Sequence, residues 1–382
     1  MDLICFCHIR WKFVYQRPQH LMTRFAKYDR VFFIEEPVYE TEGESFLEVK
    51  KDGDNLWIIT SHLPDSYTDD EIVFQQKILL SKLYTENNIE NYIHWYYTPM
   101  FLSISNHLQP ALIVYDCMDE LSNFKFAPAD LKQKEKDLFR VADIVLTGGH
   151  NLYQAKKDLH NNIFPFPSSI DKEHFMQARS LKNFPADQPK TGKPIFGFYG
   201  VIDERFDIEL LRQVAARKPE WNFVIIGPVI KIDPATMPIS SNIFYPGGKT
   251  YDELPAYLAG WNVALIPFLL NDSTKYISPT KTPEYLAAGV PVLSSAIVDV
   301  VNPYAINHVV QIYYDADSFI LAGENELAKK SAEKEEWLRN VDLFLRDNSW
   351  DETWRQIRQH INLTLKNKKN STITIKQDRA YV

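Results

Sequence analysis

Short apolar runs recur at regular intervals along the first half of the chain, and helical segments lie between several of them. The runs are LICFCH near residue 3, VFFIEEP from Val31, LWIITS from Leu56, NYIHWYY from Asn91, ALIVYD from Ala111 and DIVLTGG from Asp143. Strands that alternate with helices indicate a mostly parallel sheet with helices on its faces. This pattern predicts an α/β domain of the doubly wound type.

A second series of strand candidates follows in the other half of the chain. It consists of IFGFYG from Ile195, WNFVIIGP from Trp221, NIFYPG from Asn242, WNVALIPF from Trp261 and VPVLSS from Val290. Between the two series, FPFPSSIDKEHF and the polar segment after it have no long period and carry most of the local proline, which is typical of a linker. A chain of 382 residues is long enough for two doubly wound domains in tandem. We expect a first domain over 1–170, a linker over 171–193 and a second domain over 194–348.

The end of the chain contains one amphipathic segment, SWDETWRQIRQHINLTL. Trp354, Ile357 and Ile361 are spaced for one buried face, which predicts a helix over 349–366. Residues 367–382 are polar, and we expect them to form a tail without ordered structure.

Composition and charge restrict the class of protein. An apolar content of 45% and a charged content of 24% are those of a globular chain. The formal net charge of -8 argues against nucleic acid as a partner, because proteins that bind nucleic acids present basic surfaces. The N-terminus MDLICFCHIR does not resemble a secretory signal, and no apolar run approaches the roughly 18 to 20 residues that span a bilayer. We expect a cytoplasmic protein.

Three cysteines, Cys5, Cys7 and Cys117, fit a reducing compartment. Cys5 and Cys7 could be considered as metal ligands together with His8. However, LICFC alternates like a strand, and its two thiols lack the usual zinc spacing. We therefore expect these cysteines to lie in the core and predict no metal site.

The segment SPTKTPEYLAAGVPVLSS is the most informative stretch of the sequence. Thr282 is a good N-cap, Pro283 suits the first helical position, and Glu284 falls in the first turn, where the helix dipole favours an acid. Gly289 supplies a left-handed residue that closes the helix, and a short buried strand follows. The segment therefore predicts a loop, a short helix and a strand.

This helix start combines two kinds of binding group. Its backbone N–H groups beside Lys281 make an anion site, and the carboxylate of Glu284 can accept hydrogen bonds from hydroxyls. Phosphate and sugar hydroxyls together suggest a nucleotide. The alternative is a well-capped helix with a solvated lysine and glutamate on its rim.

Loops at the carboxyl ends of the strands are where ligands bind in such sheets. The loop HIRWKFVYQRPQHL after the first strand brings Arg10, Lys12 and Arg17 close together. These residues could bind a phosphate or contact an anionic membrane surface, and the alternative is a solvated loop without a ligand. The sequence G-x-G-x-x-G does not occur there or after any other strand, which argues against a nicotinamide enzyme.

Two further loops carry charged residues in informative positions. Asp116 and Asp119 follow a continuous apolar strand, where they could act as a base, orient an acceptor hydroxyl or cap the next helix. Arg205 follows the first strand of the second domain, where a phosphate-binding group is expected. The neighbouring Asp203 and Glu204 could instead hold this arginine in a surface ion pair.

Taken in order, the motifs RPQHL, YDCMDE, SSIDKEHF, FGFYGVIDER and PTKTPEYLAAGVPVLSS resemble those of the GT-B glycosyltransferases. The resemblance is greatest to the retaining group with a Glu-x7-Glu signature, also described as glycosyltransferase family 4-like or group 1. It implies two Rossmann-like domains that face a central cleft. It also implies that the glutamate matching Glu284 contacts the ribose of a nucleotide-sugar and that Arg205 holds its diphosphate. The terminal helix should cross back onto the first domain.

The chain departs from the family pattern at several positions. The first glutamate of the signature corresponds to Tyr276, and the arginine after the glycine of the first C-domain strand corresponds to Val201. The lysine that follows it is absent, and Asp116 stands near the place of the family's histidine. These departures keep two alternatives open, a catalytically silent nucleotide-sugar-binding protein and a nucleotide-sugar epimerase.

The function predicted from the sequence is transfer of a sugar from a nucleoside-diphosphate donor to a hydroxyl of a polysaccharide or lipid-linked saccharide. We expect a UDP- or GDP-linked donor, no other cofactor, no metal and, from the family resemblance, retention of configuration. Peripheral membrane contact at the inner membrane face is expected through Arg10, Lys12, Arg17 and Arg24. The predicted catalytic residues are Asp116 and Asp119, and the predicted donor-binding residues are Arg205, Gly247, Ser278, Lys281, Thr282 and Glu284.

Overall fold

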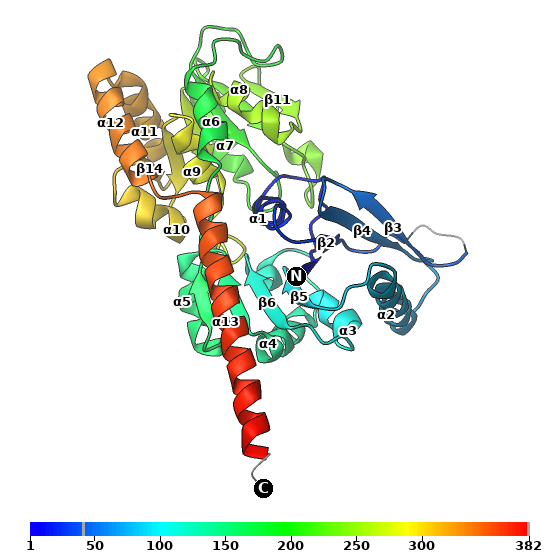
Figure 1. Cartoon of the computed structure of the whole chain (residues 1–382). Coiled ribbons are helices and arrows are strands. Elements are labelled where there is room, and N and C mark those ends of the chain that lie inside the picture. Colours follow the sequence, from blue (N-terminus) through cyan, green and yellow to red (C-terminus); the bar gives the residue numbers. More distant parts are fainter. Residues whose placement is uncertain (40–42, 380–382) are drawn as a thin grey trace.

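The computed structural model describes residues 1–39 and 43–379, and for residues 371–379 it describes the backbone alone. Two α/β domains lie one above the other in Figure 1, and one long helix runs down from the upper domain along the lower one. The predicted fold class, two doubly wound domains with mainly parallel sheets, is confirmed.

The first domain contains an eight-stranded sheet in the order β3-β4-β2-β1-β5-β6-β7-β8. Its neighbours pair in parallel except for β3, which lies antiparallel to β4 at one edge. The strands are β1 (Asp2–Phe6), β2 (Val31–Ile34), β3 (Phe46–Lys51), β4 (Leu56–His62), β5 (Tyr92–Tyr96), β6 (Leu112–Cys117), β7 (Ile144–Thr147) and β8 (Ile163–Pro165). The helices are α1 (Arg17–Phe25), α2 (Asp69–Glu86), α3 (Leu102–Ser105), α4 (Leu131–Val141) and α5 (His150–Lys156).

The second domain contains a six-stranded parallel sheet in the order β11-β10-β9-β12-β13-β14. Its strands are β9 (Ile195–Tyr199), β10 (Asn222–Ile226), β11 (Ile243–Gly247), β12 (Val263–Ile266), β13 (Val292–Ser295) and β14 (Val310–Tyr313). Its helices are α6 (Lys172–Met176), α7 (Ile208–Arg217), α8 (Leu254–Leu258), α9 (Lys281–Ala287), α10 (Val298–Val300), α11 (Ala316–Ala328) and α12 (Ser331–Phe344).

The central strands are buried because helices cover both faces of each sheet. Every residue of β1, β5, β9 and β10 is buried, which agrees with their continuous apolar sequences. Cys5, Cys7 and Cys117 are free thiols in this core. Within the described part of the chain, no group of three or more His, Cys, Asp or Glu residues is arranged to hold a metal ion.

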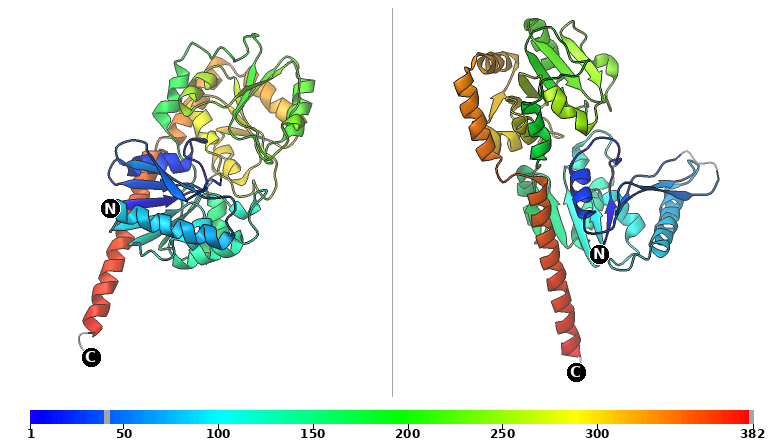
Figure 2. Two further views of the ribbon diagram at one scale, coloured as in Figure 1. Left: turned by 90° about the vertical axis from the view of Figure 1, so that its right-hand side faces the viewer. Right: turned by 45° about the horizontal axis from the view of Figure 1, so that its top comes forward.

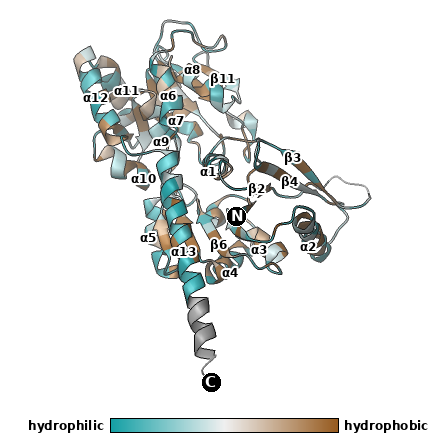
Figure 3. Cartoon of the chain, viewed as in Figure 1, coloured by the Kyte–Doolittle hydropathy of each residue, from teal (hydrophilic) through white to brown (hydrophobic). Residues whose placement is uncertain are grey.

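The last helix, α13 (Trp350–Arg379), returns to the first domain. Trp350, Ile357 and Ile361 are buried in the core of that domain, and Asp351 pairs with Arg24 at 3.0 Å. Figure 2 shows that the helix continues beyond the body of the domain, and Figure 3 shows many hydrophilic residues along it. No helix among the described residues has the length and apolar character needed to cross a membrane.

The expectation of an unstructured tail over 367–382 is wrong for most of its length. Helix α13 continues to Arg379, and residues 380–382 lie outside the described residues. The segment from Trp350 onwards contains neither proline nor glycine, so nothing in its composition stops the helix at residue 366.

The order of strands reverses in both sheets, next to β1 in the first and next to β9 in the second. Such points leave a crevice at the carboxyl ends of the strands, because the helices on either side go to opposite faces. We therefore expect ligands to bind at the carboxyl ends of the strands beside β1 and beside β9.

Candidate active site

A cleft with a volume of about 940 Å³ lies between the two domains. Loops that follow β1 and β6 line it from the first domain, and loops that follow β9, β10 and β12 line it from the second. Representative lining residues from these five loops are Lys12, Asp119, Gly200, Gly227 and Phe268. The cleft therefore lies at the carboxyl edges of both sheets, where ligand binding is expected.

Helix α9 provides one wall of the cleft, but it begins earlier than predicted. Thr280 is its N-cap and Lys281 its first residue, because the N–H of Thr282 already donates to Pro279 O at 3.1 Å. The prediction of Thr282 as N-cap is therefore wrong. Thr282 is fully buried, and its hydroxyl has no hydrogen-bond partner among the residues described. Gly289 adopts φ 77° after the helix, as predicted.

The ammonium group of Lys281 lies near two aromatic rings on the cleft wall. Its Nζ is 5.6 Å from the ring centroid of Phe198 and 5.7 Å from that of Phe268. Burial, together with the nearby charge of Arg205, lowers the pKa of Lys281 to about 8. Gly200, at φ 137°, makes room for this side chain, since a Cβ there would overlap Lys281 Cε. An anionic ligand would stabilise the ammonium form of this lysine.

Glu284 lies one turn further along α9 and is 4% exposed. The hydroxyl of Tyr199, at the end of β9, donates to Glu284 Oε2 at 2.5 Å. Burial raises the pKa of Glu284 to about 7, while the hydrogen bond from Tyr199 and the charge of Lys281 oppose this shift. A ligand that donates hydroxyl hydrogen bonds would favour the ionised form of this carboxyl.

Arg205 lines the cleft and is also held in an ion pair. Its Nε lies 2.9 Å from Asp203 Oδ1, and its Nη2 lies 2.7 Å from Asp203 Oδ2. Its guanidinium carbon is 5.2 Å from the ring centroid of Phe124, which belongs to the first domain. The ion-pair alternative for this arginine is therefore present, and the paired guanidinium also lines the cleft.

The structure separates the two predicted catalytic aspartates. Asp116 is fully buried and accepts hydrogen bonds from Arg17 Nε at 3.0 Å on both oxygens. Asp119 lines the cleft, and burial raises its pKa to about 6, against the lowering charges of Arg205, Arg17 and Lys281. Asp119 is thus placed to contact a ligand, whereas Asp116 is placed to hold an arginine.

Three lining residues received no role in the sequence analysis. Asp171 and His174 belong to the motif SSIDKEHF, and Tyr251 follows β11. The ring of His174 stacks on that of Tyr251 at 4.3 Å, and the buried hydroxyl of Tyr251 lacks a hydrogen-bond partner in the described part of the chain. The charge of Asp171 contributes to the raised pKa of Glu284. The sequence signal that could have identified two of them is the presence of an acid and a histidine, Asp171 and His174, in the linker motif.

Ser278 and Gly247 differ in their relation to the cleft. Ser278 lines it, and its carbonyl accepts a hydrogen bond from Ser168 Oγ at 2.5 Å. The carbonyl of Gly247 accepts from the N–H of Gly227 at 3.0 Å, and it is the next residue, Gly248, that lines the cleft.

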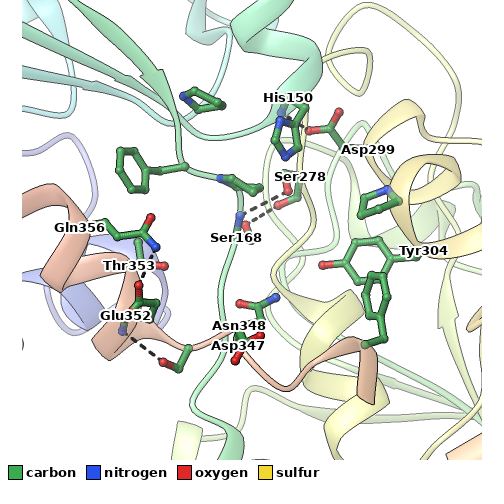
Figure 4. Close-up of a pocket in the computed structure, with 16 residues that line it drawn as sticks. His150, Ser168, Ser278, Asp299, Tyr304, Asp347, Asn348, Glu352, Thr353 and Gln356 are labelled. Atoms are coloured by element: carbon green, nitrogen blue, oxygen red, sulfur yellow. Dashed lines mark hydrogen bonds between the residues drawn. The ribbon is translucent and has the colours of Figure 1, made fainter. Parts of the chain in front are cut away.

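A smaller crevice, of about 350 Å³, lies where the two domains join (Figure 4). The carboxylate of Asp299 accepts from the N–H of His150 at 2.8 Å and of Asn151 at 2.9 Å, at the start of α5. Figure 4 also shows Ser168 bonded to Ser278 beside it. These contacts connect the domains next to the cleft.

The chain is similar to proteins of known type in both sequence and structure. No protein-family model matches it. It is 24% identical over 327 residues to a Bacillus subtilis (strain 168) protein named "Putative teichuronic acid biosynthesis glycosyltransferase TuaH", covering 78% of this chain and 79% of that protein.

Three solved structures illustrate the structural similarity. A sucrose-phosphate synthase from Thermosynechococcus elongatus has a TM-score of 0.72 at 15% identity, covering 96% of this chain and 99% of that one. A trehalose-6-phosphate synthase structure from E. coli bound with UDP-2-fluoro glucose has a TM-score of 0.71 at 11% identity, with coverage of 96% and 99%. An α,α-trehalose-phosphate synthase (UDP-forming) from Burkholderia xenovorans in complex with glucose-6-phosphate has a TM-score of 0.66 at 12% identity, with coverage of 94% and 99%.

These solved structures are GT-B glycosyltransferases, and each is covered almost completely by this chain. Their low sequence identities establish the shared fold. The sequence prediction of two Rossmann-like domains facing a cleft is therefore confirmed, and the chain has the GT-B fold of the glycosyltransferases.

Proposed function

We propose that this protein transfers a sugar from a nucleoside-diphosphate donor to a hydroxyl of a saccharide acceptor. The observation that carries the proposal is the placement of Lys281 and Glu284 on one wall of the cleft, against the end of the central strand β9. This wall carries a cation that can bind a diphosphate and a carboxyl that can accept hydrogen bonds from ribose hydroxyls.

The donor is proposed to be UDP- or GDP-linked and to lie against the second domain. Its diphosphate contacts Lys281, Ser278 and Arg205, while its ribose hydroxyls donate to Glu284. The E. coli protein bound with UDP-2-fluoro glucose supports a donor of this class. Thr282 and Gly247 are proposed to shape this wall from behind, since neither is among the described residues that line the cleft.

The transfer breaks the bond between the sugar C1 and the diphosphate oxygen and forms a bond between C1 and the acceptor oxygen. The developing negative charge on the diphosphate is stabilised by Lys281 and Arg205, which ion pairing and packing hold in place. These fixed cations supply the charge that a divalent cation would otherwise supply, and we propose a metal-independent reaction.

The acceptor is proposed to lie against the first domain, with its reacting hydroxyl beside Asp119. We propose retention of configuration, in which the departing diphosphate takes the acceptor proton and Asp119 orients the hydroxyl. The Bacillus subtilis relative, whose name includes teichuronic acid biosynthesis, supports a polysaccharide or lipid-linked saccharide acceptor.

We also propose that the protein acts in the cytoplasm, with the first domain in contact with the inner membrane face. Of the four basic residues expected there, Arg10, Arg17 and Arg24 are paired with Glu35, Asp116 and Asp351, respectively. Lys12 and its neighbour Phe13 are exposed beside the cleft. The available attraction to anionic lipid is therefore small, about 1 kcal/mol for one lysine.

Incubation of the protein with UDP- and GDP-sugars and saccharide acceptors tests the proposal. Transfer of the sugar, or slow hydrolysis of one donor, is the expected result. An isomerised donor would identify an epimerase, and donor binding without any turnover would identify a silent binding protein.

A further inference from the structure

We propose that Arg17, with Lys12 near it, binds an anionic group of the acceptor, either a phosphate or a carboxylate. This inference rests on the proposed function, because it assigns a chemical class to the acceptor of that reaction. It concerns the first-domain wall of the cleft, opposite the residues proposed for the donor.

Arg17 is the first residue of α1, and its side chain is held rigidly. It is 4% exposed, its Nε donates to both carboxylate oxygens of Asp116 at 3.0 Å, and its Nη1 donates to Phe166 O at 2.7 Å. Arg17 nevertheless lines the cleft. A guanidinium fixed in this way loses little conformational entropy when it binds a ligand.

One nitrogen of this guanidinium, Nη2, is ion-paired but lacks a hydrogen bond of acceptable geometry among the described residues. A guanidinium has five N–H donors, and the hydrogen bonds that Arg17 makes with described residues come from Nε and Nη1. Nη2 lies 2.9 Å from Asp116 Oδ1, but it makes no hydrogen bond of acceptable geometry with any described residue. Buried N–H groups of a charged side chain rarely lack an acceptor. An anionic ligand in the cleft would supply one.

Both walls of the cleft place positive charge near the carboxyl of Asp119. The charges of Arg17 on its own domain and of Arg205 and Lys281 on the other all act on its carboxyl. An acceptor whose anionic group contacts Arg17 would place a neighbouring hydroxyl at Asp119, facing the donor. This arrangement gives the two cationic walls separate ligands, the acceptor anion and the donor diphosphate.

Lys12 adds a charge that is not neutralised. It is exposed, lines the cleft on the same loop, and forms no ion pair in the described part of the chain. Arg10, two residues before it, is instead paired with Glu35 at 3.1 Å and does not line the cleft. Arg17 is itself balanced by Asp116, so Lys12 supplies the net positive charge and Arg17 the directional hydrogen bonds.

The test measures binding of four probes to the full chain by calorimetry, with and without UDP or GDP. The probes are glucose 6-phosphate, glucuronate, farnesyl phosphate and glucose, so a sugar phosphate, a uronate and a lipid phosphate are distinguished. At least one anionic probe is expected to bind about tenfold or more tightly than glucose, the effect of one charge-assisted hydrogen bond.

The variants separate binding from folding. The double variant R17Q/D116N replaces the buried ion pair with two amides and should abolish the preference for the anionic probe. The exposed substitution K12Q cannot disturb the core and should weaken that probe severalfold. The matched control R10Q removes a cation from the same loop outside the cleft and should leave all four affinities unchanged.

Two results would overturn the inference. One is a wild-type protein that binds none of the three anionic probes more tightly than glucose. The other is a preference that survives in both R17Q/D116N and K12Q. The proposed function fails separately, when neither UDP nor GDP binds the wild-type protein, because donor binding depends on the other wall of the cleft.

Discussion

Glu284→Gln tests the donor site with little change in shape. The amide oxygen of glutamine can still accept the hydrogen bond from Tyr199, so the free energy of unfolding should change little. The variant loses the charge that makes hydrogen bonds from ribose hydroxyls strong. A hydrogen bond to a charged group contributes about 1.5–3 kcal/mol, so the Kd for UDP or GDP should rise about 10- to 150-fold.

The pH dependence of binding gives the same substitution a second readout. The pKa of Glu284 is raised to about 7, so donor affinity in the wild-type protein should increase as the pH rises through that value. The pKa of Lys281 is lowered to about 8, so affinity should fall above it as the ammonium group loses its proton. Glu284→Gln should lose the acidic limb of this profile and keep the alkaline limb.

On the acidic side, protein stability should change with pH in the direction opposite to donor affinity. Glu284 binds its proton more tightly in the folded state than in the unfolded state, where its pKa is the ordinary 4.5. Its contribution to stability is therefore greatest below pH 4.5. The contribution is lost as the pH rises through about 7, and Glu284→Gln should remove this part of the slope.

Glu326→Gln is the matched control, because Glu326 on α11 is equally buried at 4% exposure but pairs with Lys329, outside the cleft. Calorimetric titration of UDP and GDP at a series of pH values measures all three proteins. A Glu284→Gln variant whose affinity stays within about twofold of wild type, or that keeps the acidic limb, would refute the assignment.

Five further predictions concern other residues and segments. Gly200→Ala should weaken donor binding, since its Cβ would displace Lys281 and its backbone conformation would cost about 1–3 kcal/mol; unchanged calorimetric affinity would contradict this. Asp119→Asn should lower turnover with donor affinity intact, by about a hundredfold if Asp119 is the base and by less if it only orients the acceptor, and near-wild-type turnover would leave the aspartate no role in the chemistry. Asp116→Asn should instead lower the free energy of unfolding, by about 3–5 kcal/mol, because it leaves a buried arginine without its partner; an unchanged denaturation midpoint would refute this. Truncation before α13 should give insoluble or unstable protein, which a soluble and active fragment would disprove. Flotation with anionic vesicles should show weak binding that salt abolishes, and no salt-sensitive binding would exclude the proposed membrane contact.

The sequence predicts the fold well where strands are buried on both faces. The predicted runs correspond to β1, β2, β4, β5, β6 and β7 in the first domain and to β9 to β13 in the second. The strands it misses carry weaker signals. Strand β3 lies at an edge and is largely exposed and charged, β8 is three residues long and ends in a proline, and β14 contains the exposed Gln311. Edge strands lack the continuous apolar run, because only one neighbour and one face constrain them.

The site is predicted in part, and the reasons differ from residue to residue. Lys281 and Glu284 carry charge at a helix start, which is visible in a sequence. Tyr199 and Tyr251 are aromatic residues of a kind common in cores, and only the structure shows that they line the cleft. The burial of Asp116 depends on Arg17, which is distant in the sequence, and local patterns do not reveal such a pair.

In the resemblance to the retaining group, the first signature glutamate corresponds to Tyr276. This tyrosine packs against the core of the first domain instead of lining the cleft. Four of the described acids that line the cleft, Asp171, Asp252, Glu253 and Glu284, follow the first sheet in the chain, and Asp119 is the one on the first-domain wall. Asp119 is the carboxyl that we propose meets the acceptor hydroxyl. If the product retains the anomeric configuration of the donor, the diphosphate takes the proton and Asp119 orients the acceptor. If the configuration inverts, Asp119 is the base, and its raised pKa suits that role. Proton NMR of the product, compared with that of the donor, therefore distinguishes the two roles of Asp119.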